Sequence, residues 1–86
     1  MSQDPEAVAE AICRFLRDDI LAEGVAFDAA TPLARLGVDS LAIVELLLFV
    51  ERRFGVTVPE ARLTRAVLGS AESLARCVCE LESDEG

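Results

Sequence analysis

Residues 39–55 read DSLAIVELLLFVERRFG, and this stretch decides the fold. Asp39 or Ser40 can cap a helix with a side-chain oxygen, and Gly55 is a typical helix stop. Nine of the ten positions from Leu41 to Val50 are apolar, more than one core-facing stripe needs. The stretch therefore predicts a helix from residue 39 or 40 to Phe54, with one apolar face for the core and another for a partner.

Upstream of this helix the sequence predicts a long first helix. Asp4-Pro5-Glu6 supplies a capping oxygen, a proline at the first helical position and an acid in the first turn. A helical-period apolar stripe follows, and Gly24 is a plausible stop, so we expect a helix from Pro5 to Glu23. The stripe consists of Val8, Ile12, Phe15, Leu16 and Ile20.

Residues 25–38 predict a connection that contains a short turn of helix. Thr31-Pro32 repeats the cap-then-proline signal, and Gly37 breaks the segment. Because a structureless loop of this length is uncommon, we expect Leu33 and Leu36 to pin it to the core.

Downstream, the β-branched run Val56-Thr57-Val58 before Pro59 predicts an extended link. A short helix is expected from Glu60 to Val67, with Leu63 and Val67 one turn apart. Ser70 can cap a last helix whose stripe is Leu74, Val78 and Leu81, and residues 83–86 form a charged tail. The fold class is thus all-α: a small four-helix bundle of three main helices and one short one, in a single domain (residues 1–86, core about 5–82).

Composition excludes several functions. The 86 residues carry 16 acidic and 8 basic side chains, all arginine, for a net charge of −8, and there is no histidine. This charge disfavours nucleic acid and anionic membranes as partners. A catalytic triad or a histidine-containing zinc site is excluded, and nothing indicates another metal site. Asp39 and Glu45 lie six apart, off a shared helical face, so they form no obvious catalytic pair and an enzyme is not expected.

The three cysteines, Cys13, Cys77 and Cys79, form no CxxC pair and are odd in number. We interpret them as small, mostly buried side chains in a reducing compartment. No signal peptide or membrane-spanning run is visible, so we expect a cytoplasmic monomer.

The run Leu36-Gly37-Val38-Asp39-Ser40-Leu41 lies where a loop becomes a helix, and Phe54-Gly55-Val56 and Pro59 follow later. The pattern resembles the phosphopantetheine-attachment signature of the acyl carrier protein family. The expected order of helices also matches that family, so the resemblance spans about residues 5–82.

The resemblance implies that Ser40 carries 4′-phosphopantetheine, derived from coenzyme A, through a phosphodiester. The thiol of that arm would hold acyl or aminoacyl cargo as a thioester. Asp39 would cap the helix and help a phosphopantetheinyl transferase to engage, and Gly37 would leave the approach open. A phosphate at a helix N-terminus is also favourable on physical grounds.

The resemblance further implies a docking surface after the serine, for the transferase, a loading enzyme and downstream synthase or tailoring enzymes. On this surface we expect Leu41 to be exposed and Phe49 at least half exposed. Val44, Leu47 and Val50 are assigned to the core. The expected docking residues are Leu41, Glu45, Leu48, Phe49 and Arg52.

Charge separates the alternatives within the carrier class. Residues 31–56 hold three acids and three arginines, whereas fatty-acid-synthesis carriers typically have an acidic second helix. We therefore favour a discrete carrier of a polyketide, nonribosomal peptide or related specialised pathway over housekeeping fatty acid synthesis. An unmodified, carrier-like interaction module is the alternative from another class, and modification of Ser40 separates the two.

Overall fold

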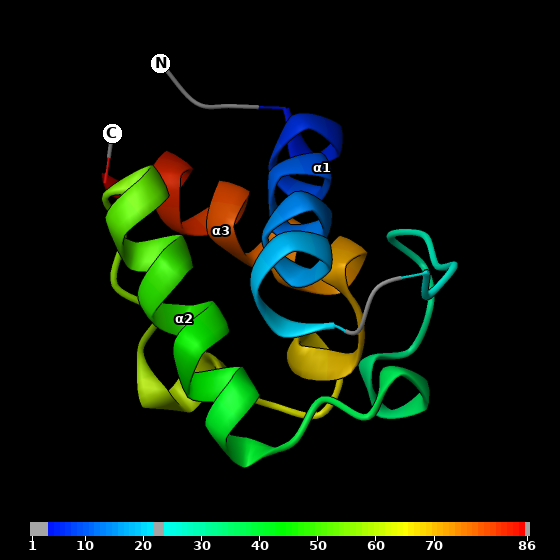
Figure 1. Cartoon of the computed structure of the whole chain (residues 1–86). Helices are drawn as coiled ribbons and strands as arrows, with labels where there is room; N and C mark the ends of the chain where they lie inside the picture. Colours follow the sequence, from blue (N-terminus) through cyan, green and yellow to red (C-terminus); the bar gives the residue numbers. More distant parts are fainter. Residues whose placement is uncertain (1–3, 22–23, 86) are drawn as a thin grey trace.

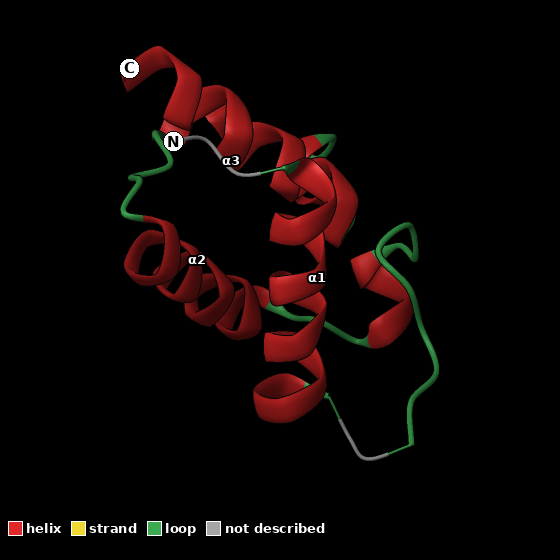
Figure 2. Cartoon of the chain, turned by 90° about the horizontal axis from the view of Figure 1, so that it is seen from above, coloured by secondary structure: helices red, strands yellow, loops and turns green. Residues whose placement is uncertain are grey.

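A computed structural model describes residues 4–21 and 24–85 of the chain. These residues form three α-helices: α1 (Pro5–Phe15), α2 (Ser40–Phe54) and α3 (Ala71–Glu85). Three short 3₁₀ turns lie in the connections, and the described part contains no strand. Figure 1 shows α2 beside α1, with α3 behind them, and Figure 2 shows the bundle from above. The expected small helical bundle is confirmed.

The first helix starts as predicted but ends earlier and differently. The Asp4 carboxylate accepts a hydrogen bond from the Glu6 N–H at 3.2 Å, so the predicted cap is confirmed. After Phe15 the chain continues as a π-helix, Leu16–Ile20, and Leu21 is already extended. The expected end at Glu23 is therefore wrong, although residues 22 and 23 themselves lie outside the described part. Asp18 and Asp19 account for the early end, because carboxylates are unfavourable near the negative end of the helix dipole.

The connection before α2 is pinned as expected, but Thr31 does not cap it. The 3₁₀ turn Leu33–Leu36 has no side-chain cap. The Thr31 hydroxyl instead accepts a hydrogen bond from the Asp28 N–H at 3.0 Å, which stabilises the preceding turn. Leu33 is buried and Leu36 packs against the core, so both pinning residues are confirmed.

The prediction of one short helix from Glu60 to Val67 is wrong. Two separate 3₁₀ turns, Glu60–Arg62 and Val67–Gly69, occupy this region. Thr64 divides them, because its hydroxyl accepts a hydrogen bond from the Val67 N–H at 3.2 Å and starts a new turn. The extended link 56–58 is confirmed, and its two valines are buried. An ion pair of 2.5 Å between Arg62 and Glu80 ties the first turn to α3.

The last helix begins at the predicted cap. The Ser70 hydroxyl accepts from the Ser73 N–H at 3.2 Å, and the Ser73 hydroxyl accepts from the Ser70 N–H at 3.0 Å. Among the helix pairs, α1 and α3 share the most extensive contact. Buried apolar side chains of α1, of the π-helix that follows it, of α2 and of α3 form the centre of the core: Val8, Ile12, Leu16, Leu46, Val50, Leu74 and Val78. None of the described helices is long and apolar enough to cross a membrane.

The faces of α2 differ in one respect from the prediction. Leu46 and Val50 are fully buried, and Leu47 packs partly against the core. Val44, which we assigned to the core, is 52% exposed. Val44 lies three residues after Leu41 and four before Leu48, so the helical period places it on the outward stripe. The prediction of two apolar faces holds, but Val44 belongs to the outer one.

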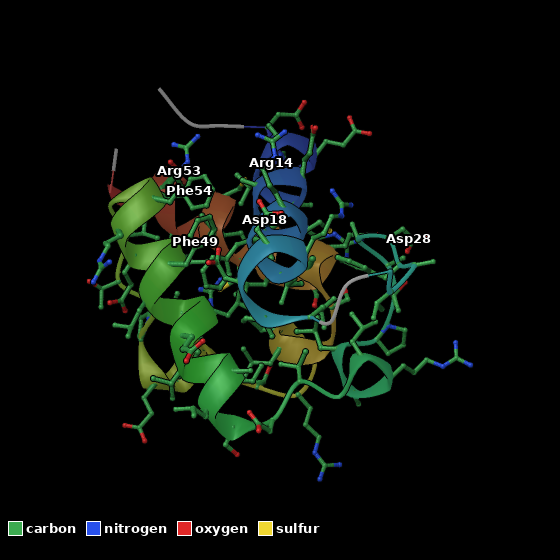
Figure 3. All side chains as sticks on the ribbon, viewed as in Figure 1. Arg14, Asp18, Asp28, Phe49, Arg53 and Phe54 are labelled. Atoms are coloured by element: carbon green, nitrogen blue, oxygen red, sulfur yellow. The ribbon has the colours of Figure 1, made fainter. Side chains whose placement is uncertain are left out.

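Phe49 is also less exposed than predicted. Its ring stacks on Phe15 of α1, with centroids 4.4 Å apart and planes 12° from parallel. Phe54 meets the same ring edge-on at 6.3 Å. Figure 3 shows Phe49 and Phe54 between α2 and α1. Phe49 is therefore only partly exposed and links the two helices.

This packing predicts that Phe49→Ala lowers the free energy of unfolding by about 2 kcal/mol, because a stacked, largely covered ring is removed. Leu48→Ala is the matched control, since Leu48 is 51% exposed and one residue away. Urea unfolding followed by circular dichroism measures both variants. Equal losses in the two variants would contradict the role assigned to the aromatic stack.

Candidate functional site

The loop before α2 turns sharply at Gly37. This glycine has φ +73° and ψ 23°, in the left-handed region that residues with a Cβ rarely adopt. No atom lies within 4 Å of the place where its Cβ would be. Glycine is therefore required here by the backbone conformation, and the space beside it is open to an approaching molecule.

Asp39 fixes the first turn of α2. Its carboxylate accepts a hydrogen bond from the Ala42 N–H at 2.9 Å, and its carbonyl accepts from the Ile43 N–H at 2.9 Å. The predicted cap is thus confirmed. The first bond satisfies one of the free N–H groups of the helix end. The second is the first regular bond of the helix, so the next residue, Ser40, is its first residue.

Ser40 is exposed, and its hydroxyl has no hydrogen-bond partner within the described part of the chain. It lies at the N-terminus of α2, where the helix dipole favours negative charge. A phosphate esterified to this oxygen would extend into solvent beside unpaired backbone N–H groups. The geometry therefore suits covalent attachment of an anionic group, and it needs no rearrangement of the bundle.

A cleft of about 500 Å³ lies beside the start of α2. Val38 and Ile43, which flank Asp39 and Ser40, form one side of it. The other lining residues come from the loop before α2 and from the 3₁₀ region, and they are mostly apolar: Pro32, Leu33, Ala34, Leu63, Thr64, Arg65, Leu68 and Gly69. A group attached to Ser40 would thus emerge next to an apolar surface.

Four of the five predicted docking residues, Glu45, Leu48, Phe49 and Arg52, line one groove between α1 and α2, and Leu41 lies outside that groove. Leu41 is 67% exposed and Leu48 is 51% exposed, and Glu45 and Arg52 are exposed on the same outward side. Phe49 points toward α1 instead. Val44 also lies on the outer stripe, a position that its spacing from Leu41 and Leu48 could have indicated from the sequence.

Three comparisons with known proteins bear on this geometry. The sequence pattern of the phosphopantetheine attachment site family matches residues 6–78. The chain belongs to this family. Proteins of the family are carriers, not enzymes, and they hold 4′-phosphopantetheine covalently. No curated protein matches the chain in sequence.

Two solved structures resemble this carrier. One is described as a Bradyrhizobium japonicum glycine:[carrier protein] ligase complexed with glycylated carrier protein; the match has 27% identity, a TM-score of 0.65, and covers 85% of this chain and 96% of that one. The other holds the same ligase with its cognate carrier protein and an analogue of glycyl adenylate; it has 28% identity, a TM-score of 0.66, and coverage of 86% and 94%. Because nearly all of each matched chain is covered, the match is to the small carrier.

The cysteines of this carrier lie on α1 and α3, whereas Ser40 begins α2. None of the three forms a disulfide within the described part of the chain: Cys77 is buried, and Cys13 and Cys79 are partly buried. Burial raises the pKa of the Cys13 thiol, and nearby Asp28 and Glu10 add to the rise against the opposing effect of Arg17. Burial likewise raises the pKa of Cys79, helped by Glu82 and Asp4. At neutral pH these two thiols are therefore less nucleophilic than an ordinary cysteine.

The cap predicts that Asp39→Ala lowers the free energy of unfolding of the carrier by about 1 kcal/mol, because one N–H of α2 loses its acceptor. Asp39→Asn keeps an acceptor oxygen and should recover most of this loss. Thermal or urea unfolding compares the two variants with the wild type. An Asn variant as unstable as the Ala variant would show that a hydrogen-bond acceptor at position 39 is not sufficient for the cap.

Proposed function

We propose that Ser40 is the attachment point of 4′-phosphopantetheine and that the chain is an aminoacyl carrier. The observation that supports this most directly is the exposed Ser40 hydroxyl at the first position of α2, behind the Asp39 cap and the open left-handed turn at Gly37. The family match and the positions of these three residues in its sequence signature support the same assignment.

The covalent step is a phosphoryl transfer. The Ser40 oxygen bonds to the phosphorus that carries pantetheine in coenzyme A, the pyrophosphate bond breaks, and adenosine 3′,5′-bisphosphate leaves. The serine proton passes to a base of the transferase, since this chain offers no histidine. This carrier contributes only the hydroxyl, the exposed helix end and the Asp39 cap beside it.

The bundle then acts as a holder for a tethered thiol. Cargo bound to the arm as a thioester stays within reach of any enzyme docked on the bundle, at an effective concentration of roughly millimolar. The chemistry of loading and transfer belongs to those enzymes. The carrier's own requirement is a rigid attachment point, which the capped start of α2 provides.

The cargo we favour is a small amino acid such as glycine. The two similar structures hold a carrier with a glycine:[carrier protein] ligase, and one of those carriers is glycylated. The two arginines at the end of α2 also differ from the acidic second helix typical of fatty-acid carriers. We place the carrier in specialised metabolism on the same grounds, with polyketide or nonribosomal peptide enzymes as alternative partners.

The experiment uses intact-protein mass spectrometry after incubation with coenzyme A, magnesium and a promiscuous phosphopantetheinyl transferase. We expect the wild type to gain one phosphopantetheine and Ser40→Ala to gain none. Circular dichroism should show the same helix content for both, because capping comes from Asp39.

Two results would count against the assignment. A mass gain that persists in Ser40→Ala would place the arm elsewhere. A folded wild type that several unrelated transferases leave unmodified would favour the alternative, a carrier-like bundle that binds other proteins without an arm.

A further inference from the structure

The cleft beside the start of α2 has one charged side chain among the described residues that line it, Arg65. The cleft has a volume of about 500 Å³, and its other lining residues are uncharged. Arg65 belongs to the short stretch between the two 3₁₀ turns. In Figure 1 this stretch, drawn in yellow, passes the lower end of α2, where that helix begins. A cation therefore lines the same cleft as Val38 and Ile43, the residues that flank Asp39 and Ser40.

Arg65 is exposed, and it has no anionic partner within the described part of the chain. The ion pairs found there use other arginines, and the arginines that lie over aromatic rings are different again: Arg14, Arg62 and Arg76 for the pairs, Arg17 and Arg53 for the rings. No acidic side chain of the described residues lines the cleft. The guanidinium of Arg65 is therefore available to an anion from outside the bundle.

The modification proposed at Ser40 supplies such an anion. The phosphodiester at the root of phosphopantetheine is negatively charged at neutral pH, and it is bonded directly to the serine oxygen. A guanidinium pairs with a phosphate through two parallel hydrogen bonds, a geometry that an ammonium group does not provide. The tether keeps the arm near the cleft at an effective concentration of roughly millimolar. A covalent arm therefore outcompetes any diffusing ligand of similar affinity.

The next groups of the arm also suit the cleft. Beyond the phosphate the arm has a carbon with two methyl groups, followed by a hydroxyl and two amides. Leu63 and Leu68 offer apolar surface to the methyl groups. The Thr64 hydroxyl accepts a hydrogen bond from the Val67 N–H, which leaves its own proton to donate to an amide carbonyl. The cleft thus offers a cation, an apolar wall and a donor to an arm that presents an anion, methyl groups and carbonyls.

We propose that Arg65 binds the phosphodiester at Ser40 and that the dimethyl part of the arm lies against the cleft. The inference rests on the proposed function, because it requires the arm. Arg65 holds the root of the arm in one orientation on the resting carrier. Loading and transfer remain with the enzymes, and a docked enzyme must break this ion pair to draw the arm into its active site.

The cargo is the competing occupant of the cleft. The ammonium group of an aminoacyl thioester would meet Arg65, a like charge, and the described lining has no carboxylate to pair with it. Burial of an unpaired charge is costly. We therefore expect an amino acid at the far end of the arm to stay outside the cleft while the root is held.

The test compares NMR spectra of the ¹⁵N-labelled full-length chain without the arm and with the unloaded arm. Transfer from coenzyme A prepares the second form, and mass spectrometry verifies one phosphopantetheine in each sample. We expect attachment to shift the amide signals of the cleft residues and the Nε–H signal of Arg65. Added salt should reduce the shift of the Arg65 signal, because it screens an exposed charge pair.

Variants then separate Arg65 from the general field of the protein. In Arg65→Gln the ratio of held to mobile arm, read from the cleft signals, should fall about threefold, as expected for an exposed charge pair. Arg65→Lys should give an intermediate ratio, since the charge remains but the paired hydrogen bonds do not. Arg35→Gln is the matched control: it makes the same change in net charge at an exposed arginine that does not line the cleft. Circular dichroism verifies that each variant is folded.

Three results would overturn the inference. The first is an equal loss in Arg65→Gln and Arg35→Gln, and the second is cleft signals that do not respond to the arm. The third is cleft signals that respond only when the arm carries an uncharged chain, transferred from hexanoyl-coenzyme A, which would assign the cleft to cargo.

The mass measurement judges the proposed function separately. If the wild type accepts no arm, free 4′-phosphopantetheine is titrated into the unmodified chain. Arg65→Gln should weaken that binding, again by about threefold. Cleft signals that respond equally in the wild type and in Arg65→Gln would contradict the role of Arg65 without bearing on Ser40.

Discussion

The hydrogen bond from the Ala42 N–H to the Asp39 carboxylate sets where α2 begins, and the proposed attachment at Ser40 depends on that position. Gly37 turns the chain into the cap through its left-handed conformation, and Ser40 becomes the first helical residue. A shift of the start by one residue would rotate Ser40 by about a quarter of a turn around the helix axis. The exposed hydroxyl would then leave its place between the open loop and the apolar cleft. A single local bond therefore connects the sequence signature to the chemistry of attachment.

The second constraint on α2 is that it must serve the core and the surface together. Leu46 and Val50 attach it to the α1–α3 core, and the stacking of Phe49 on Phe15 fixes its approach to α1. The outward stripe is left apolar at a cost in solubility, which the net charge of −8 offsets. In a chain of 86 residues with a small core, such a stripe is best explained by binding.

Local signals in the sequence predicted the parts of the fold that depend on neighbouring residues. The caps at Asp4, Asp39 and Ser70 and the stop at Gly55 each involve residues within four positions, so the residue types alone indicate them. These local signals also gave the order of the helices and the position of Ser40 at the start of α2. Thr31 does not cap the following turn, because its hydroxyl accepts a hydrogen bond from the N–H of Asp28, three residues earlier.

Features that depend on tertiary packing were not predictable in the same way. Phe49 was expected to be at least half exposed because the sequence does not show that Phe15 of α1 stacks on its ring. Val44 is a different case: its spacing from Leu41 and Leu48 already indicates the outer stripe, but α2 is apolar almost all round, which masks that signal. The helix expected from Glu60 to Val67 has the right composition, yet the Thr64 hydroxyl stabilises a new turn instead.

The spatial arrangement of the charges on α2 and on the π-helical segment is visible only in the folded chain. In sequence, residues 31–56 are neutral, which suggests docking with little electrostatic contribution. In the structure three of these charges, Glu45, Arg52 and Arg53, line one groove between α1 and α2, together with Asp19 of the π-helical segment that follows α1. A neutral segment with separated charges steers a partner less strongly from a distance than an acidic helix does, since its field falls off faster. At contact, however, it distinguishes one orientation of the partner from the reverse, because the wrong orientation brings like charges together. For a carrier whose arm must enter one active site at a time, orientation at contact matters more than the rate of encounter.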